Sequence, residues 1–216
     1  PPRPPRARDA LELDVPRRAA RTHSRISLDL NGIAKGFAVD QLARCLQKHG
    51  VHDFLVGIDG EMRAAGHKPD GSAWAVALEK PLRGRREVLG ALELTDASIA
   101  TSGDYRHWRE RDGTSFSHTM DPHSGAPLLS PLTSVSVICT SCMYADAWAT
   151  ALTVLGADAG LALAERLGLA ARFLDRNGDA ALAIGAWNLA ALQGPGGQPG
   201  GDGPRSGGWC PWGLLR

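Results

Sequence analysis

The order in which helical patterns and short apolar runs follow one another most restricts how this chain can fold. Apolar residues recur at helical spacing in three stretches: from Ala34 to a stop at Gly50, over residues 145–155, and over residues 158–167. Runs typical of strands fill most of the chain between the first two. A doubly wound parallel sheet needs a helix between successive strands, and this chain does not alternate in that way. The pattern therefore predicts an α+β fold, with mixed or antiparallel sheets and packed helices in a single domain.

The expected strands are short runs bounded by turn residues. They cover residues 11–15, 26–30, 54–58, 61–65, 74–78, 88–94, 134–139, 173–175 and 180–184. Asp59-Gly60 and Asn177-Gly178 are dipeptides typical of hairpin turns and lie between consecutive runs. Residues 101–131 are dense in Ser, Thr, Gly, Pro and His, so we expect the longest irregular stretch there, and such stretches are often functional.

Composition changes at both ends of the chain. Pro and Arg dominate residues 1–10, and Gly and Pro dominate residues 191–216, so we expect both segments to be disordered around a domain of residues 11–190. The net charge of +1 gives no basic footprint for nucleic acid. No apolar run approaches the ~20 residues of a membrane span, and no signal peptide is visible.

The four cysteines are too few and too scattered for a disulfide framework. Cys139 and Cys142 form a C-x-x-C pair, but no second pair accompanies it to complete a zinc site. We therefore expect no metal or redox role for this pair.

The stretch SLDLNGIAKG, residues 27–36, marks an expected passage from strand to helix. Helix N-termini bind phosphate well, Gly32 lets the backbone approach a ligand closely, and Lys35 adds a positive charge nearby. Asp29 lies on the other side of the turn. On these residues alone, two interpretations stay open: a phosphate site, or a tight turn with Lys35 in solvent.

The stretch MYADAWATAL, residues 143–152, places a carboxylate and a hydroxyl on one helix face. Asp146 and Thr150 are four residues apart and so point the same way. Both offer the hard oxygen ligands that Mg²⁺ prefers. The alternative is local, with Asp146 as a first-turn carboxylate favoured by the helix dipole.

The stretch SFSHTMDPHSGAP, residues 115–127, brings His118, Asp121 and His123 together in sequence. A histidine beside a carboxylate can act as a general acid or base, whereas the alternative is a polar surface loop. A serine-hydrolase triad is not expected, because no G-x-S-x-G elbow occurs in the chain.

Taken in order, these stretches resemble the FAD:protein FMN transferase family, the ApbE type. The resemblance covers roughly residues 11–185 and rests on LDLNGIAKGFAVDQLA, GEMRAAGHKPDGSAWAVAL, ASIATSGDYRHW, SHTMDPHSGAPL and SVSVICTSCMYADAWATALTVLG. It implies an enzyme that transfers FMN from FAD to a Thr or Ser hydroxyl of an acceptor flavoprotein. It also implies release of AMP, a requirement for Mg²⁺, and a location in the cell envelope or periplasm.

The resemblance also assigns roles to residues of the three stretches. It implies that Mg²⁺ is bound by the backbone carbonyl of Gly32 and by Asp146 and Thr150. Asp29 and Lys35 would contact FAD.

The remaining assignments fall on the third stretch. His118 and Met120 would line the FAD pocket, with His118 near the reacting phosphate. We expect His118 and Asp146 to be the catalytic residues, and we favour His118 over Asp146 as the general base.

Family members usually carry a longer N-terminal region that supplies part of the flavin pocket, and nothing in this chain matches it. Two other functions therefore remain open beside the transferase. One is a Mg²⁺-dependent FAD pyrophosphatase that releases FMN and AMP. The other is a degenerate, non-catalytic FAD-binding module.

Overall fold

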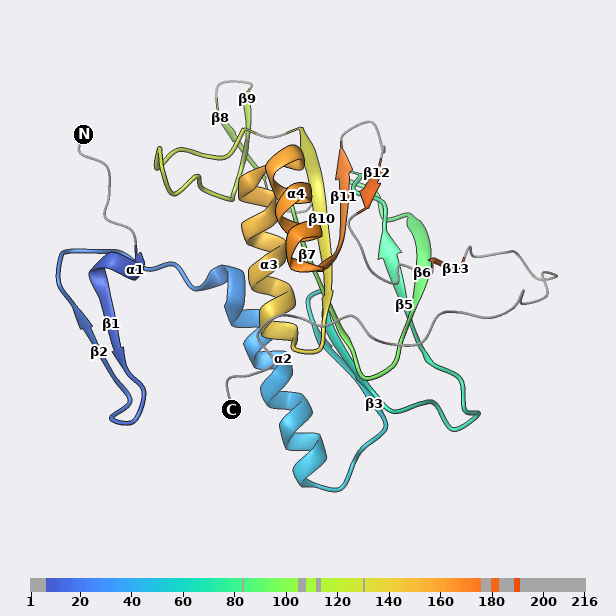
Figure 1. Ribbon diagram of the computed structural model, residues 1–216. Coiled ribbons are helices and arrows are strands. Elements are labelled where there is room, and N and C mark those ends of the chain that lie inside the picture. Colours follow the sequence, from blue (N-terminus) through green and yellow to red (C-terminus); the bar gives the residue numbers. More distant parts are fainter. Residues whose placement is uncertain are drawn as a thin grey trace.

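The computed structural model in Figure 1 describes residues 7–82, 84–104, 108–111, 114–129, 131–175, 180–182 and 189–190. Its helices are α1 (Ala7–Ala10), α2 (Asn31–Lys48), α3 (Cys142–Leu155) and α4 (Ala157–Leu167). Its strands are β1 (Leu11–Asp14), β2 (Ala19–Thr22), β3 (Phe54–Ile58), β4 (Glu61–Ala65), β5 (Trp74–Glu79), β6 (Val88–Leu94), β7 (Ser98–Gly103), β8 (Trp108–Arg111), β9 (Thr114–Ser117), β10 (Leu132–Cys139), β11 (Ala170–Asp175), β12 (Ala180–Leu182) and β13 (Leu189–Ala190).

The central element is a six-stranded sheet with the order β12-β11-β10-β7-β4-β3, and a three-stranded sheet has the order β13-β6-β5. Every pairing within these two sheets is antiparallel. The expected α+β class with antiparallel sheets and packed helices is therefore confirmed.

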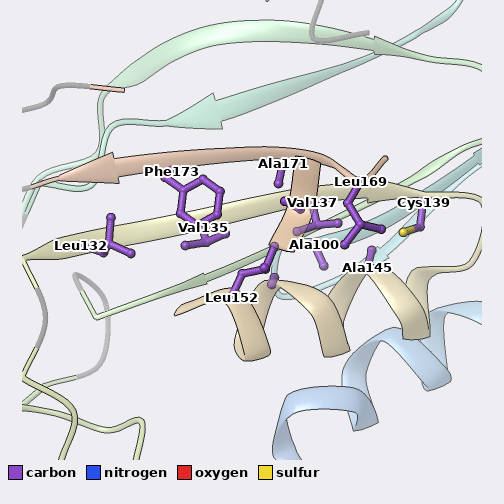
Figure 2. Close-up of a cluster of buried hydrophobic side chains, with 12 residues drawn as sticks. Ala100, Leu132, Val135, Val137, Cys139, Ala145, Leu152, Leu169, Ala171 and Phe173 are labelled. Carbon is purple, nitrogen blue, oxygen red and sulfur yellow. The ribbon is translucent and has the colours of Figure 1, made fainter. Parts of the chain in front are cut away.

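One face of the six-stranded sheet is covered by α3 and α4 and forms the main core. Figure 2 shows side chains of β10, β11 and α3 meeting there, among them Val135, Leu152 and Phe173. All three are almost fully buried. Since burial of a large apolar side chain stabilises by about 1.5–3 kcal/mol, this cluster fixes α3 on the sheet.

The other face of the sheet meets the three-stranded sheet in a second apolar cluster. Val76 and Leu78 of β5 and Leu92 of β6 pack there against Ile99 of β7. Because the two clusters lie on opposite faces of β7, neighbouring residues of this strand alternate between them: Ile99 belongs to the second cluster and Ala100 to the first.

The strand expected at residues 26–30 is absent, which corrects the sequence interpretation. These residues have no regular secondary structure, and α2 already begins at Asn31. Leu28 and Leu30 are 50% and 59% exposed. Their alternation is compatible with a strand, but a strand also requires a hydrogen-bonding neighbour, and no described strand pairs with this segment.

The expectation of a long irregular stretch over residues 101–131 is wrong in part. The stretch contains the end of β7 and the β8–β9 hairpin. Its Ser and Thr content suggested a loop, but hydroxyl side chains also suit a sheet face that is polar. Thr101 of β7 and Ser136 of β10, for example, are directly opposite and share a 2.8 Å hydrogen bond.

The expected arm of residues 1–10 contains the short helix α1 at its end, whereas residues 1–6 lie outside the described residues. The expected tail, residues 191–216, and the turn at Asn177-Gly178 also lie outside them. The division of the chain into arm, domain and tail therefore stays a prediction. The strands on either side of that turn, β11 and β12, pair as expected.

Candidate active site

A cavity of about 920 Å³ opens between the N-terminal end of α2, β4, the β5–β6 pair and the polar face of the six-stranded sheet. Six of the seven site residues predicted from sequence line it: Asp29, Gly32, Lys35, His118, Asp146 and Thr150. Segments separated by more than a hundred positions in sequence are thus brought to one cavity.

Two glycines of α2 allow this helix to approach α3 closely. A methyl group at Gly36 would lie 2.3 Å from the backbone oxygen of Cys142, and one at Gly32 would lie 2.9 Å from Thr150 Oγ1. Gly32 and Gly36 are one helical turn apart and therefore face α3 together. They lie within α2, so the expected turn is a helix–helix contact instead.

Asp146 lies in that contact, where α3 meets the first turns of α2. The backbone N–H of Gly36 donates a 2.9 Å hydrogen bond to Asp146 Oδ2. Burial raises the pKa of Asp146 above its ordinary value, although the Gly36 hydrogen bond and the charge of Lys35 oppose the shift. The other carboxylate oxygen, Oδ1, accepts no hydrogen bond from the described residues. It is therefore available to bind a cation or to accept a hydrogen bond from a molecule in the cavity.

Lys35 lies among three carboxylates. Its Nζ is 2.9 Å from Glu61 Oε1 and 3.7 Å from Asp59 Oδ2, and Asp146 also acts on it electrostatically. Burial lowers the pKa of Lys35, but the hydrogen bond and charges of these carboxylates outweigh burial and raise it overall. One cation among three carboxylates leaves an excess of negative charge, which favours a divalent cation at this end of the cavity.

Glu61 is the most buried of these carboxylates, at 2% exposure, and begins β4. Its Oε2 is buried and has no hydrogen-bond partner among the described residues. Burial raises the pKa of Glu61, with Lys35 acting in the opposite direction. A buried carboxylate oxygen without a hydrogen-bond donor raises the free energy of the folded state. We therefore expect this oxygen either to bind a ligand or to carry a proton.

The oxygen ligands available at the Asp146 end of the cavity match the coordination preferences of Mg²⁺. Asp146 and Thr150 lie on one face of α3 beside Gly32, and Glu61 lines the same cavity. Within the described part of the chain, no group of three or more His, Cys, Asp or Glu side chains could hold a metal ion. Mg²⁺ does not need such a group, because it usually binds one or two carboxylates together with waters and phosphate oxygens.

Thr150 is held in place by β7. Its Oγ1 is 2.9 Å from Ser102 Oγ, in a hydrogen bond in which either hydroxyl can donate. Ser102 also lines the cavity. This contact fixes the rotamer of Thr150 and ties the C-terminal half of α3 to the sheet.

Asp40 anchors α2 to the start of α3 from within the protein. Its carboxylate accepts hydrogen bonds from Ser141 Oγ, the N–H groups of Cys142 and Met143, and Arg63 Nη1. Burial opposes ionisation of Asp40, but these donors outweigh burial and lower its pKa below the ordinary value. Asp40 therefore acts as a cap for α3 supplied by another helix.

His118 lies on the loop that follows β9, is exposed, and lines the cavity. The carboxylate of Asp121 bonds to residues that follow it closely in the chain. It accepts hydrogen bonds from the His123 N–H at 2.8 Å and Ser124 Oγ at 2.9 Å. Asp121 therefore shapes the turn, and His123 is exposed and absent from the cavity lining.

Met120 and Asp29 differ in their relation to the cavity. Met120 is 48% exposed and is not among the described residues that line the cavity, so its expected contact with FAD stays a prediction. Asp29 lies just before α2, where its Oδ1 accepts a 2.8 Å hydrogen bond from the Asn31 N–H. No described side chain caps α2 otherwise, and its first turn contains no acidic residue.

Sequence reasoning did not select Asp40, Glu61 or Ser102 as site residues. A signal existed for Glu61, since a charged residue at the first position of an apolar strand is unusual after a hairpin dipeptide. Asp40 and Ser102 gave no such signal, because their roles depend on contacts with α3.

The C-x-x-C pair lies at the junction of β10 and α3. Cys139 and Cys142 are both buried, and neither is in a disulfide bond. Burial, together with Asp40, Glu61 and Asp146, strongly raises the pKa of the Cys142 thiol. A thiol with a raised pKa is a poor nucleophile and metal ligand, so the pair serves packing.

Comparison with known proteins gives the family. The model of the ApbE family matches residues 4–173, which is most of the chain. This chain belongs to the ApbE family.

The curated relatives of this ApbE-family chain carry a common name. A FAD:protein FMN transferase of Vibrio cholerae serotype O1 is 46% identical over 64% of this chain and 41% of its own length. One of Haemophilus influenzae is 38% identical over 78% of this chain and 50% of its own length. The chain therefore spans about half the length of the curated relatives it matches.

Solved structures agree with this assignment. The apo flavinyl transferase ApbE of Pseudomonas stutzeri has a TM-score of 0.69 and 42% identity, covering 81% of this chain and 54% of that one. The flavin transferase ApbE of Vibrio cholerae has the same TM-score at 34% identity. Separately, the described helices include none with the length and apolar composition of a membrane span.

Proposed function

We propose that this ApbE-family chain transfers FMN from FAD to a Thr or Ser hydroxyl of an acceptor flavoprotein, with Mg²⁺ bound and AMP released. The observation that carries the proposal is the meeting of the α2 N-terminus, the Asp146–Thr150 face of α3 and His118 at one cavity. Each of these three features suits one part of a pyrophosphate reaction. The names of the relatives supply the identity of the nucleotide.

The α2 N-terminus and Lys35 are the groups that would bind the pyrophosphate. In the first turn of α2, the Asn31 N–H donates to Asp29 Oδ1 and the Ile33 N–H to the Leu30 carbonyl, so the main contribution of this turn is the positive end of the helix dipole. Lys35 adds a charge one helical turn further along, held in orientation by Glu61. These groups bind and orient the phosphates at the end of the cavity where α3 lies.

Gly32, Asp146 and Thr150 would hold Mg²⁺, through a backbone carbonyl, a carboxylate and a hydroxyl. The bound ion would neutralise the pyrophosphate and stabilise the leaving phosphate. Gly36 holds Asp146 by its backbone N–H, and Ser102 holds Thr150 by a hydroxyl. The two side chains are thus kept in position before any ligand binds, which lowers the cost of binding.

In the reaction, the acceptor hydroxyl oxygen attacks the phosphorus on the FMN side, and the bond from that phosphorus to the bridging oxygen breaks. The electron pair of that bond leaves with AMP. We assign the hydroxyl proton to His118, which is exposed and lines the cavity. Asp146 is a weaker choice, because metal binding and the Gly36 N–H occupy its carboxylate.

The test is to incubate the full chain with FAD, Mg²⁺ and a candidate acceptor domain and to look for covalent flavin by in-gel fluorescence. Fluorescence in the acceptor band, lost when its Thr or Ser is replaced by Ala, is the expected result. FMN and AMP formed without labelling would replace the proposal by FAD hydrolysis. No turnover with any FAD-dependent acceptor would reject an enzymatic role for the chain.

A further inference from the structure

Arg172 lies on the cavity face of the six-stranded sheet. Its neighbours in β11, Ala171 and Phe173, are buried in the core cluster on the opposite face. Because side chains alternate along a strand, Arg172 points away from that core, and it lines the cavity. Arg172 has no role in the phosphate-binding, metal-binding or catalytic steps proposed above.

Arg172 continues a row of polar side chains across the sheet. It is directly opposite Ser136 of β10, which is opposite Thr101 of β7. Neighbouring strands are about 4.8 Å apart, so Arg172 lies about 10 Å across the sheet from Thr101. All three side chains line the cavity, so the Arg172 guanidinium lies beside a polar strip of the sheet that faces it.

Two guanidinium nitrogens of Arg172 are buried, although the residue as a whole is half-buried. These nitrogens, Nε and Nη1, form no hydrogen bond with any of the described residues. Burial lowers the pKa of Arg172, and no neighbouring charge contributes to the shift. By contrast, the other Lys and Arg side chains among the described cavity residues are paired: Lys35 with Glu61, and Arg86 with Glu79.

A buried charge without a counterion is unfavourable, because it loses hydration and gains nothing in return. A ligand with negative charge removes this cost. Phosphate fits better than an apolar group or a neutral sugar, since guanidinium N–H groups match phosphate oxygens. Of the hydrogen-bonded Ser136 and Thr101 hydroxyls, the one that accepts from the other can also donate to a phosphate oxygen.

We propose that Arg172 binds a phosphate group of the nucleotide that occupies the cavity. The proposal rests on the proposed function for the choice of a nucleotide, and it adds a site on β11 to those on α2 and α3. The phosphate belongs either to intact FAD or to the AMP that leaves, and titration with each separates the two.

The experiment uses the full chain and its Arg172→Met and Arg172→Lys variants. Affinities for FAD, ADP, AMP and riboflavin are measured by calorimetric titration with Mg²⁺ present, and melting temperatures are measured without ligand. Arg166→Met is the matched control, because Arg166 is an exposed arginine in the last turn of α4.

We expect Arg172→Met to weaken ADP binding at least tenfold and to leave riboflavin, which has no phosphate, unchanged. Arg172→Lys keeps the charge and should lose less. Without ligand, Arg172→Met should melt at the same or a higher temperature than the parent chain, because an unpaired buried charge has been removed. A residue with a purely structural role would lower the melting temperature. If Arg172→Met weakens binding of both FAD and AMP, Arg172 contacts the phosphate of the AMP half. If it weakens binding of FAD but not of AMP, Arg172 contacts the phosphate of the FMN half.

Unchanged ADP affinity in Arg172→Met, or no ADP binding by the parent chain, overturns the proposal. If Arg172→Met does not fold, Arg172→Lys decides: ADP affinity equal to the parent overturns the proposal, and weaker affinity supports it. The titration needs no turnover. A chain that binds ADP through Arg172 but transfers no FMN would therefore refute the proposed function and leave this inference standing.

Discussion

Replacing Asp40 by alanine should destabilise the whole site without touching the cavity. Asp40 is 4% exposed and comes from α2, yet its carboxylate receives the first N–H groups of α3. It also pairs with Arg63 of β4, whose side chain is 25% exposed. The substitution removes an ion pair and a helix cap in one step.

The expected loss in the free energy of unfolding is the sum of these two contributions. Breaking a buried ion pair by removing one partner costs about 3–5 kcal/mol, and loss of a helix cap costs about 1 kcal/mol. The sum is about 4–6 kcal/mol, a large part of the ~5–15 kcal/mol by which folded domains are stable. For a chain of this size, that corresponds to a fall in melting temperature of roughly 8–24 °C.

The assay is denaturant unfolding of the full chain at pH 7 and at pH 3. Asp158→Ala is the control, because Asp158 is an exposed carboxylate in the first turn of α4. Its loss should cost no more than about 1 kcal/mol. Asp40→Asn keeps one acceptor oxygen and should fall between the two.

The stabilisation that Asp40 provides should decrease as the pH falls. The pKa of Asp40 is lowered in the folded protein, so its stabilisation is present above the unfolded value, about 3.9, and is lost as pH falls through the folded pKa. The difference between the parent chain and Asp40→Ala should therefore shrink at pH 3. A loss at pH 7 no larger than that of Asp158→Ala would refute the role of Asp40 as the anchor of α3.

Three further predictions concern the cavity. Asp146→Asn keeps an oxygen for the Gly36 N–H but loses the negative charge that we propose binds Mg²⁺. Turnover should therefore fall by about two orders of magnitude or more, while the melting temperature without Mg²⁺ stays level or rises. His118→Ala should slow FMN release from FAD, measured in single-turnover assays, whereas His123→Ala should be mild. Gly36→Ala should cost about 3 kcal/mol in denaturant unfolding, because its methyl group would lie 2.3 Å from the Cys142 oxygen.

Each of these three predictions can be contradicted by a specific measurement. The pKa of Asp146 is raised by burial, so stability without metal should fall as pH rises from the unfolded carboxyl value, about 3.9, to the folded one. Asp146→Asn should not show this fall. Near-normal turnover of Asp146→Asn at limiting Mg²⁺ would remove the metal assignment. Equal or reversed effects of the two histidines would mean that the loop is misinterpreted, and a Gly36→Ala protein as stable as the parent would mean that α2 and α3 are not in close contact.

Local sequence signals predicted the strands that form hairpins with their neighbours. The strands expected at 54–58, 61–65 and 88–94 match β3, β4 and β6, because alternation and a turn dipeptide act within a few residues. The segment 26–30 has similar alternation but no strand beside it. Whether a partner strand exists is decided by distant parts of the chain, so the sequence pattern alone could not settle it.

The candidate site was predictable where spacing within one element decides the geometry. Asp146 and Thr150 share a face of α3 because they are four residues apart, and the structure has both of them at the cavity. Glu61 and Arg172 are different, since what singles them out is a buried atom without a partner. Whether a buried atom finds a partner depends on distant parts of the fold, so the local sequence, even where it marks Glu61 as an unusual charge, does not reveal it.

The contact between α2 and α3 also has a consequence for synthesis of the protein. Gly36 and Asp146 are 110 positions apart, so α2 leaves the ribosome long before its partner helix exists. At roughly 5–20 residues per second, this interval lasts about 5–20 s. Throughout it the glycine face of α2 lacks the helix it packs against, and the Asp40 carboxylate has Arg63 available but not the N–H groups of α3. The side of the cavity formed by α3 therefore cannot exist until α3 has been made, so the cavity is completed late in synthesis.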